Sequence, residues 1–341
     1  MDIRELITIS AASIRTKAFV KLLEDDSENP VFLQGLLGSS APVFFAGVAE
    51  TIKKVSSSEG PFLFILNDAD EAGYFYHDLT QLLGNEQVLF FPSSYRRAVK
   101  YGQRDAANEI LRTEVLTRLS PQPSTLNPQP STLFIVTHPE AIAERVVSQQ
   151  QLDERTLQLS VGQTVDLMEV EKTLRDYGFT ETDYVYEPGQ FAVRGSILDV
   201  YSYSSELPFR IDFFGDDIDT IRTFEVDSQL SHERKETVTI VPELSVQESV
   251  KVPVLQFFPD NTVLVTRGLD FIRDTIGQIY ETGFSKQTMI ERLEEATELE
   301  QEEIRREMER DSQLITGAQF AEDAARFRQV ILKSQSINLQ P

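Results

Sequence analysis

The sequence predicts an α/β protein: a parallel sheet with helices on both faces that carries an inserted small α+β domain. Strands and helices alternate through residues 1–148, and strand-like alternation of period two dominates residues 149–244. In residues 245–341 short strands are expected at residues 253–258 and 262–266, and a helix at residues 269–280 follows the second strand. Strands that alternate with helices are typical of a parallel sheet covered on both faces, whereas half-buried strands of period two are typical of antiparallel sheets.

The first 148 residues supply the elements of the parallel sheet. The continuous apolar run Pro61–Leu66 is typical of a strand buried on both faces. A helical lead-in is expected in residues 1–29. Further strands are expected at residues 31–33, 88–92 and 133–137, and helices at residues 43–55, 68–83, 106–119 and 139–147.

The turn after the strand at residues 31–33 has the layout of a phosphate-binding loop without its chemistry. Such loops follow the pattern GxxxxGK[ST] between a strand and a helix. Gly35 stands at the first glycine and Gly38 lies inside the turn, but Ser40, Ala41 and Pro42 occupy the positions of the second glycine, the lysine and the hydroxyl residue. From this stretch alone a generic glycine turn is the safer interpretation, and no cofactor is expected.

Two runs within residues 149–244 alternate with period two, as half-buried strands do. In residues 191–194 and 209–214 the side chains expected to face the core are Phe191, Val193, Phe209, Ile211 and Phe213. The other face then carries Arg194, Arg210 and Phe214, and we expect both guanidinium groups to point to solvent. Arginine and aromatic side chains are enriched among interface anchors. An ordinary sheet face with one exposed phenylalanine would produce the same pattern.

These strands lie within the run GQFAVRGSILDVYSYSSELPFRIDFFGDDIDTIRTFEVDSQ, residues 189–229. The run resembles the UvrB-like module at the N-terminus of bacterial transcription-repair coupling factors (the Mfd family), and the resemblance covers most of residues 31–244. It implies a UvrB-like domain 1a with a decayed P-loop in residues 1–148 and an inserted UvrA-binding domain 2 in residues 149–244. Residues 245–341 would be the domain 1b return segment and an acidic helical tail.

The resemblance also implies a partner and a function. Two arginines and an aromatic residue of the family contact UvrA, the damage-recognition protein of nucleotide excision repair, and they match Arg194, Arg210 and Phe214. The chain would be a non-catalytic UvrA-recruiting module. Full-length family members are ATP-dependent DNA translocases that displace stalled RNA polymerase, so RNA polymerase and duplex DNA would bind only through parts absent from this chain.

Two other functions fit parts of the sequence less well. The alternative is a UvrB-like NTPase or helicase half with residual nucleotide or DNA binding, against which Ala41 and Pro42 argue. A free-standing α/β hydrolase is disfavoured because the sequence contains no GxSxG motif.

Composition narrows the possible partners and cofactors. The 32 Lys and Arg against 55 Asp and Glu give a net charge of −23, which opposes binding to DNA phosphates. The absence of cysteine excludes disulfides, thiolate catalysis and Cys-ligated zinc, and the three histidines are too widely spaced to form a metal motif. Without a signal sequence or a long apolar run, we expect a cytoplasmic protein with no membrane contact.

Two further segments carry no functional motif. PQPSTL stands at residues 121–126 and again at residues 128–133, and a Pro-rich repeat of this kind is typical of an extended surface loop. Residues 289–311 hold 4 Lys and Arg against 10 Asp and Glu, and they predict an acidic helix that packs on one side.

Overall fold

The computed structural model describes residues 2–23, 30–55, 60–94, 105–120, 132–244, 251–283, 301 and 314–333. Contacts within the chain group it into two units. The first unit contains residues 1–93, 129–146 and 251–341, and the second contains residues 94–128 and 147–250. The chain therefore enters and leaves the second unit twice, while the domain boundaries near residues 148 and 244 stay predictions.

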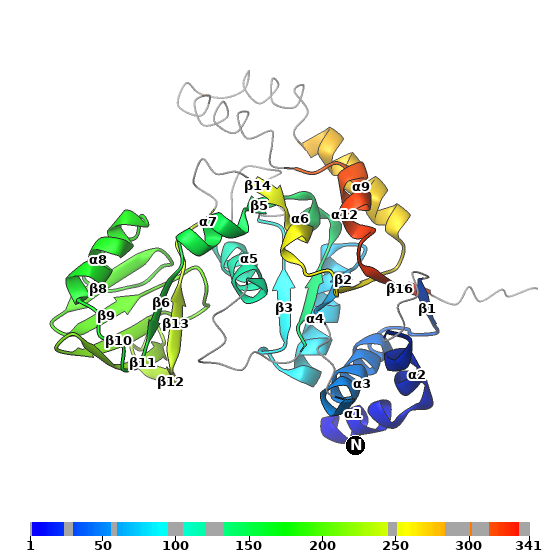
Figure 1. The fold of residues 1–341 in the computed structure, drawn as a ribbon, viewed down its shortest axis with the longest axis horizontal. Helices are drawn as coiled ribbons and strands as arrows, with labels where there is room; N and C mark the ends of the chain where they lie inside the picture. The colour runs from blue at the N-terminus through cyan, green and yellow to red at the C-terminus, as the bar shows by residue number, and fades with distance from the viewer. Residues whose placement is uncertain are drawn as a thin grey trace, which may run out of the picture. The chain divides into compact units, whose positions relative to one another are not determined.

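The first unit is built on a six-stranded sheet whose paired strands are all parallel, in the order β1-β16-β15-β2-β4-β3 (Figure 1). The predicted parallel sheet is thus confirmed. Its strands are β1 (Val31–Gln34), β2 (Phe62–Ile65), β3 (Val88–Phe91), β4 (Phe134–Thr137), β15 (Val263–Thr266) and β16 (Arg328–Lys333). Strand β16 was not expected, although it lies between β1 and β15 and joins the two ends of the chain in one sheet.

Helices cover both faces of this sheet, as predicted. One face packs against α2 (Ile14–Leu23), α3 (Ser40–Val55) and α4 (Ala69–Leu83), and α1 (Ile3–Ala12) packs against α3. Its core is rich in phenylalanine, and the rings of Phe62 and Phe134 stack with centroids 5.1 Å apart. The other face is covered by α6 (Pro139–Ala143), α9 (Leu269–Gly283) and α12 (Gly317–Ala324), of which α9 contacts both others.

Three expectations in the first unit need correction. The helix expected at residues 139–147 ends at Ala143 and is followed by β5 (Arg145–Val147), which pairs with β14 (Lys251–Pro253). The strand expected at residues 253–258 is instead the 3-10 helix η1 (Val254–Phe257). Helix α3 begins three residues before the expected start at Val43.

The acidic helix and most of the PQPSTL duplication fall on residues outside the described part of the chain.

The second unit is the predicted α+β unit. Its six-stranded sheet has the order β12-β11-β10-β9-β8-β7 and is antiparallel except for the parallel pair β7 and β8. The strands are β7 (Thr180–Glu181), β8 (Gln190–Arg194), β9 (Ile197–Val200), β10 (Phe209–Phe214), β11 (Asp217–Phe224) and β12 (Ser231–Lys235). Strands β9 and β12 were not expected from the sequence.

One face of this sheet forms the core of the second unit. It packs against α8 (Leu167–Asp176) and against the ribbon of β6 (Leu157–Ser160) and β13 (Thr237–Ile240). Helices α5 (Ala106–Leu119) and α7 (Gln149–Glu154) also belong to this unit. The side chains predicted to face the core do so: Phe191, Phe209, Ile211 and Phe213 are buried, and Val193 is half-buried against them.

Candidate protein-binding face

The antiparallel sheet of the second unit has one face that is turned away from α8. This face carries a row of charged side chains that runs across neighbouring strands. Strand register places Asp199 opposite Arg210, Arg210 opposite Arg222, and Arg222 opposite Arg234. Residues directly opposite one another on neighbouring strands point to the same face. The predicted position of Arg210 on this face is therefore correct, and the sheet surrounds it with other charged groups.

Asp199 is the centre of this charged face. It is buried, and its carboxylate accepts two hydrogen bonds from Arg210, from Nε at 2.7 Å and from Nη2 at 2.8 Å. Arg194 donates to the same carboxylate through Nη2. A buried carboxylate is stable only when charged partners compensate its lost hydration, and two guanidinium groups do so here. The residues Arg194 and Arg210, predicted from two different strands, thus meet on one aspartate.

Arg210 is held inside the face and does not point to solvent. Its side chain is only 15% exposed, and besides Asp199 it bonds the carbonyl oxygen of Gln229 at 3.3 Å and the side-chain Oε1 of Gln229 at 3.1 Å. Its guanidinium also lies 4.4 Å from the centre of the buried Phe224 ring. The hydrogen bonds to Asp199 raise the pKa of Arg210 above its ordinary value. The expectation of a solvent-facing head was wrong because strand β9, which supplies Asp199, was not predicted.

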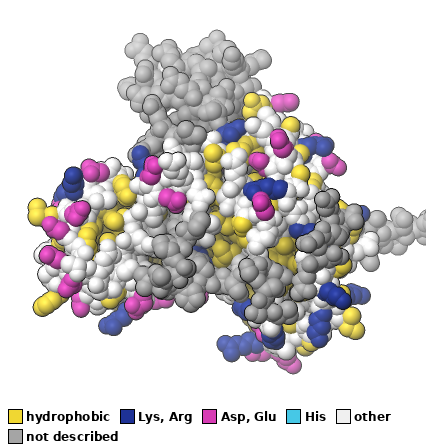
Figure 2. Space-filling model, in the orientation of Figure 1, with side chains coloured by type: hydrophobic (Ala, Val, Ile, Leu, Met, Phe, Trp, Pro, Cys, Tyr) yellow, Lys and Arg dark blue, Asp and Glu magenta, His cyan; other side chains and the backbone are white. Residues whose placement is uncertain are grey.

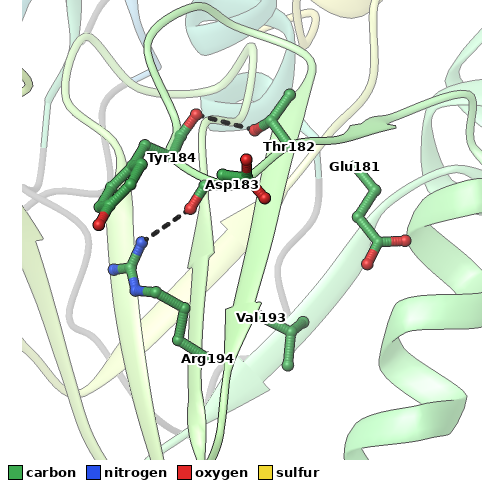
Figure 3. A pocket seen from close by; sticks show the side chains of 6 residues that line it. All are labelled: Glu181, Thr182, Asp183, Tyr184, Val193 and Arg194. Carbon is green, nitrogen blue, oxygen red and sulfur yellow. Dashed lines mark hydrogen bonds between the residues drawn. The ribbon is translucent and has the colours of Figure 1, made fainter.

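Arg194 is more accessible. Its side chain is 34% exposed, and its Nη1 donates to the backbone carbonyl of Asp183 at 3.2 Å (Figure 3). Its guanidinium lies 5.0 Å from the centre of the Tyr184 ring. The salt bridge to Asp199 and the contact with Tyr184 fix the direction of the side chain, so part of the guanidinium is presented to solvent in a defined position.

Phe214 is the most exposed of the three predicted residues. It is the last residue of β10, and 82% of its surface is exposed. Gly215, with φ of 65°, makes the turn into β11 that holds this phenylalanine at the tip of the hairpin. Phe214 follows Arg210 by four residues, about 13 Å along a strand. Because the Phe214 ring is not packed in the core, it is a candidate contact residue for a partner. The sequence predicts the same role.

Asp199 and the loop before β8 were missing from the predicted site. Asp199 stands in the run Ile197-Leu198-Asp199-Val200, where period two puts it on the same face as Ile197 and opposite Leu198. An aspartate inside a short apolar strand near two arginines is a signal that could have indicated the ion pair. The tyrosines of residues 184 and 186 gave no comparable pattern, because they lie outside regular strands.

The predicted phosphate-binding turn lies in the first unit, between β1 and α3. Gly35 and Gly38 have positive φ values of 86° and 51°, and the Ser40 hydroxyl donates to the carbonyl of Leu37 at 2.7 Å. Ala41, at the lysine position, is buried in the core between α3 and the sheet. Pro42, also in the first turn of α3, has no N–H to donate. The strand, turn and helix are present, and the lysine position points into the core.

The described residues contain neither a metal-ligand cluster nor a membrane-spanning helix. No group of three or more metal-ligating His, Cys, Asp or Glu side chains occurs among them. Within the same residues, no helix has the length and apolar content needed to span a bilayer. On the side of the second unit seen in Figure 2, carboxylates are scattered between apolar side chains.

Part of the second unit matches a known protein family, and longer stretches of the chain match known proteins. Residues 157–245 match the family model described as the UvrB interaction domain. A transcription-repair-coupling factor of Bacillus subtilis (strain 168) is 29% identical over 211 residues, which cover 62% of this chain and 17% of that protein. Its counterpart in Escherichia coli (strain K12) is 34% identical over 108 residues, covering 32% of this chain and 9% of that protein.

A third relative, the transcription-repair-coupling factor of Myxococcus xanthus, is 28% identical over 192 residues, which cover 53% of this chain and 15% of that protein. The matches with these relatives therefore span less than a fifth of their length. The family-model match contains Asp199 and the three predicted contact residues, and it coincides with the sheet that carries them.

Proposed function

Because this chain carries a UvrB interaction domain and is similar to transcription-repair-coupling factors, we propose that it recruits UvrA in transcription-coupled nucleotide excision repair. Its second unit would bind UvrA through the sheet face opposite α8. The observation that carries the proposal is that the matched residues include a sheet face on which Arg194 is one-third exposed and Phe214 is almost fully exposed.

The three residues would act in different ways. Phe214 would insert its exposed ring into an apolar site of UvrA, and Arg194 would offer its free N–H groups to a carboxylate or carbonyl of UvrA. Arg210 would serve chiefly to neutralise Asp199, because its N–H groups already donate to Asp199 and Gln229. Arg210 would thus hold the face in shape, and the direct contact would rest on the other two residues.

The proposal includes no catalytic step in this chain. The position of the P-loop lysine is occupied by buried Ala41, and that of the hydroxyl residue by Pro42. Phosphoryl transfer requires groups that neutralise the phosphates and hold Mg²⁺. Any ATP-driven translocation on DNA, together with displacement of RNA polymerase, would be performed by parts of the relatives that this chain does not match.

The proposal is tested by surface plasmon resonance with immobilised UvrA. Phe214→Ala should lower the affinity at least about thirtyfold, since loss of an aromatic anchor typically costs about 2 kcal/mol or more. The matched control is Met168→Ala on α8, because Met168 is 74% exposed and lies on the helix that covers the opposite face. This control should bind UvrA within twofold of the parent, an assumed margin of about 0.4 kcal/mol.

Both variants should retain the thermal unfolding midpoint of the parent, because neither side chain is packed. Absence of UvrA binding by the parent chain would overturn the proposed function. Equal affinity of the parent and Phe214→Ala would leave a UvrA-binding chain but remove this face as its site.

A further inference from the structure

The loop before β8 forms one side of an open hollow next to Arg194. The hollow has a volume of about 740 Å³ and is lined by Glu181, Thr182, Asp183, Tyr184, Val193 and Arg194 (Figure 3). It shares Arg194 with the face proposed to bind UvrA. A partner that contacts Arg194 would therefore also lie over this hollow.

The loop is held in a single shape by hydrogen bonds. The Thr182 hydroxyl donates to the carbonyl of Tyr184 at 2.8 Å, and the amide of Tyr186 donates to Oε1 of Gln190 at 2.9 Å. Val185, between Tyr184 and Tyr186 in sequence, is buried in a cluster with Ala192 and Phe224, and Tyr186 is 61% exposed. A rigid loop that presents tyrosines to solvent loses little conformational entropy when a partner binds.

The charged groups around the hollow differ in whether they already have partners within the chain. Arg194 and Arg210 share the single negative charge of buried Asp199, and Glu181 accepts a hydrogen bond at 2.8 Å from Arg175, which also pairs with Glu171. The exposed carboxylate of Asp183 has no hydrogen-bond or ion-pair partner among the described residues. In Figure 3 it points away from the Arg194 guanidinium, which is bound to the Asp183 backbone carbonyl. The Asp183 carboxylate is therefore available to accept a hydrogen bond or an ion pair from a partner.

The charge of the surrounding unit adds to this preference. Residues 151–245 contain 8 Lys and Arg against 20 Asp and Glu, so their field attracts cationic partners and repels phosphates. A carboxylate beside an accessible aromatic ring is a favourable site for an ammonium or guanidinium group. Nucleic acid is a poor occupant, because its phosphates would face Asp183 and Glu181.

We infer that this hollow receives a lysine or arginine side chain of the protein partner, with Asp183 as its counter-ion and Tyr184 beside it. The inference rests on the proposed function, in which that partner is UvrA. It makes the interface reciprocal: Arg194 donates to the partner, and Asp183 accepts from it. Asp183 then determines specificity, because it rejects partners with acidic or phosphorylated surfaces at this point.

The test measures UvrA affinity by surface plasmon resonance for two substitutions at residue 183. Asp183→Asn should lower the affinity about tenfold, because the neutral amide weakens the charge-assisted hydrogen bond to the partner's cation. Asp183→Lys should lower it further because two cations would then face each other. The loss should shrink as the salt concentration rises, as expected for an ion pair at an exposed rim.

The matched control is Asp153→Asn on α7, which removes the same charge from the same unit outside the hollow. It should bind UvrA like the parent, and all three variants should unfold at the parent temperature. If both residue-183 variants bind UvrA as tightly as the parent, this inference is overturned. If Phe214→Ala loses UvrA affinity in the same experiment, the proposed function still stands. If the parent chain does not bind UvrA, both the proposed function and this inference fail.

Discussion

At the scale of single residues, the candidate face depends on Asp199. Its carboxylate is buried and receives hydrogen bonds from Arg194 and Arg210, but the two arginines differ in what else they contact. Arg210 is mostly buried against Phe224 and Gln229, whereas Arg194 remains one-third exposed. Two residues that the sequence places on the same face therefore have different energetic roles.

Removal of Arg210 should destabilise the second unit more than removal of Arg194. Arg210→Ala leaves the buried Asp199 carboxylate with one remaining partner, and breaking a buried ion pair typically costs about 3–5 kcal/mol. Arg194→Ala leaves the two hydrogen bonds from Arg210 in place and should cost about 1 kcal/mol. Urea unfolding followed by circular dichroism measures both free energies of unfolding.

Arg234→Ala is the control for these two variants. Arg234 lies in the same row of the sheet, is exposed, and has no hydrogen-bond partner among the described residues. Its loss should change the free energy of unfolding by less than about 0.5 kcal/mol. Equal destabilisation by Arg194→Ala and Arg210→Ala would show that Arg210 has no special role in holding Asp199.

At the scale of elements, the strands that could be predicted are those in which apolar residues on the core face alternate with polar residues on the other face. The alternation of Phe209, Ile211 and Phe213 with polar residues in β10 is such a pattern, and the burial of these three side chains confirms it. Strand β9 was missed because Asp199 interrupts its apolar residues, and its burial is possible only with arginines from β8 and β10. Interactions between strands cannot be read from one strand's periodicity.

The same limit applies to loops and to the end of the chain. The exposed tyrosines around Val185 are positioned by hydrogen bonds from Thr182 and to Gln190, which no local sequence pattern indicates. Strand β16 pairs with β1 across nearly the whole sequence, with Val31 opposite Val330. A pairing over that separation depends on the folded sheet and not on neighbouring residues.

The β1–α3 turn should not bind nucleotide, and restoring the missing lysine should not repair it. The side chain at position 41 enters the core, so Ala41→Lys would bury an ammonium group and destabilise the first unit by several kcal/mol, on the order of the penalty for a buried charge. Isothermal titration with Mg-ATP should detect no binding by the parent or by this variant.

Leu37→Lys is the control, because it adds the same charge to the same turn at an exposed position. It should leave the free energy of unfolding within about 0.5 kcal/mol of the parent. A dissociation constant for Mg-ATP in the low micromolar range, measured on the parent chain, would contradict the proposal of a decayed phosphate-binding loop.

At the scale of the whole molecule, the chain combines an α/β unit, whose β1–α3 turn lacks the lysine and hydroxyl residue of a phosphate-binding loop, and a β-rich unit with a charged, partly aromatic face. The net charge of −23 makes the chain as a whole unfavourable for polyanions. The exposed ring of Phe214 and the free carboxylate of Asp183 point instead to contact with a protein. Both observations favour recruitment over action on DNA.

Duplex DNA should therefore bind only weakly to this chain. Non-specific affinity for DNA comes largely from cations that replace condensed counterions, and residues 151–245 hold 8 Lys and Arg against 20 Asp and Glu. Fluorescence anisotropy with labelled duplex at about 150 mM salt, where the Debye length is about 8 Å, should show no saturable binding in the micromolar range. Tight, sequence-independent binding under these conditions would contradict this expectation.

The central claim is that UvrA lies against the sheet face that ends in Phe214. Site-specific photo-crosslinking tests it most directly, with p-benzoylphenylalanine introduced in place of Phe214 in one variant and of Met168 on α8 in another. Illumination in the presence of UvrA should yield a crosslinked complex from position 214 and none from position 168. A crosslink from position 168 alone, or none from position 214 when UvrA is bound, would contradict the account.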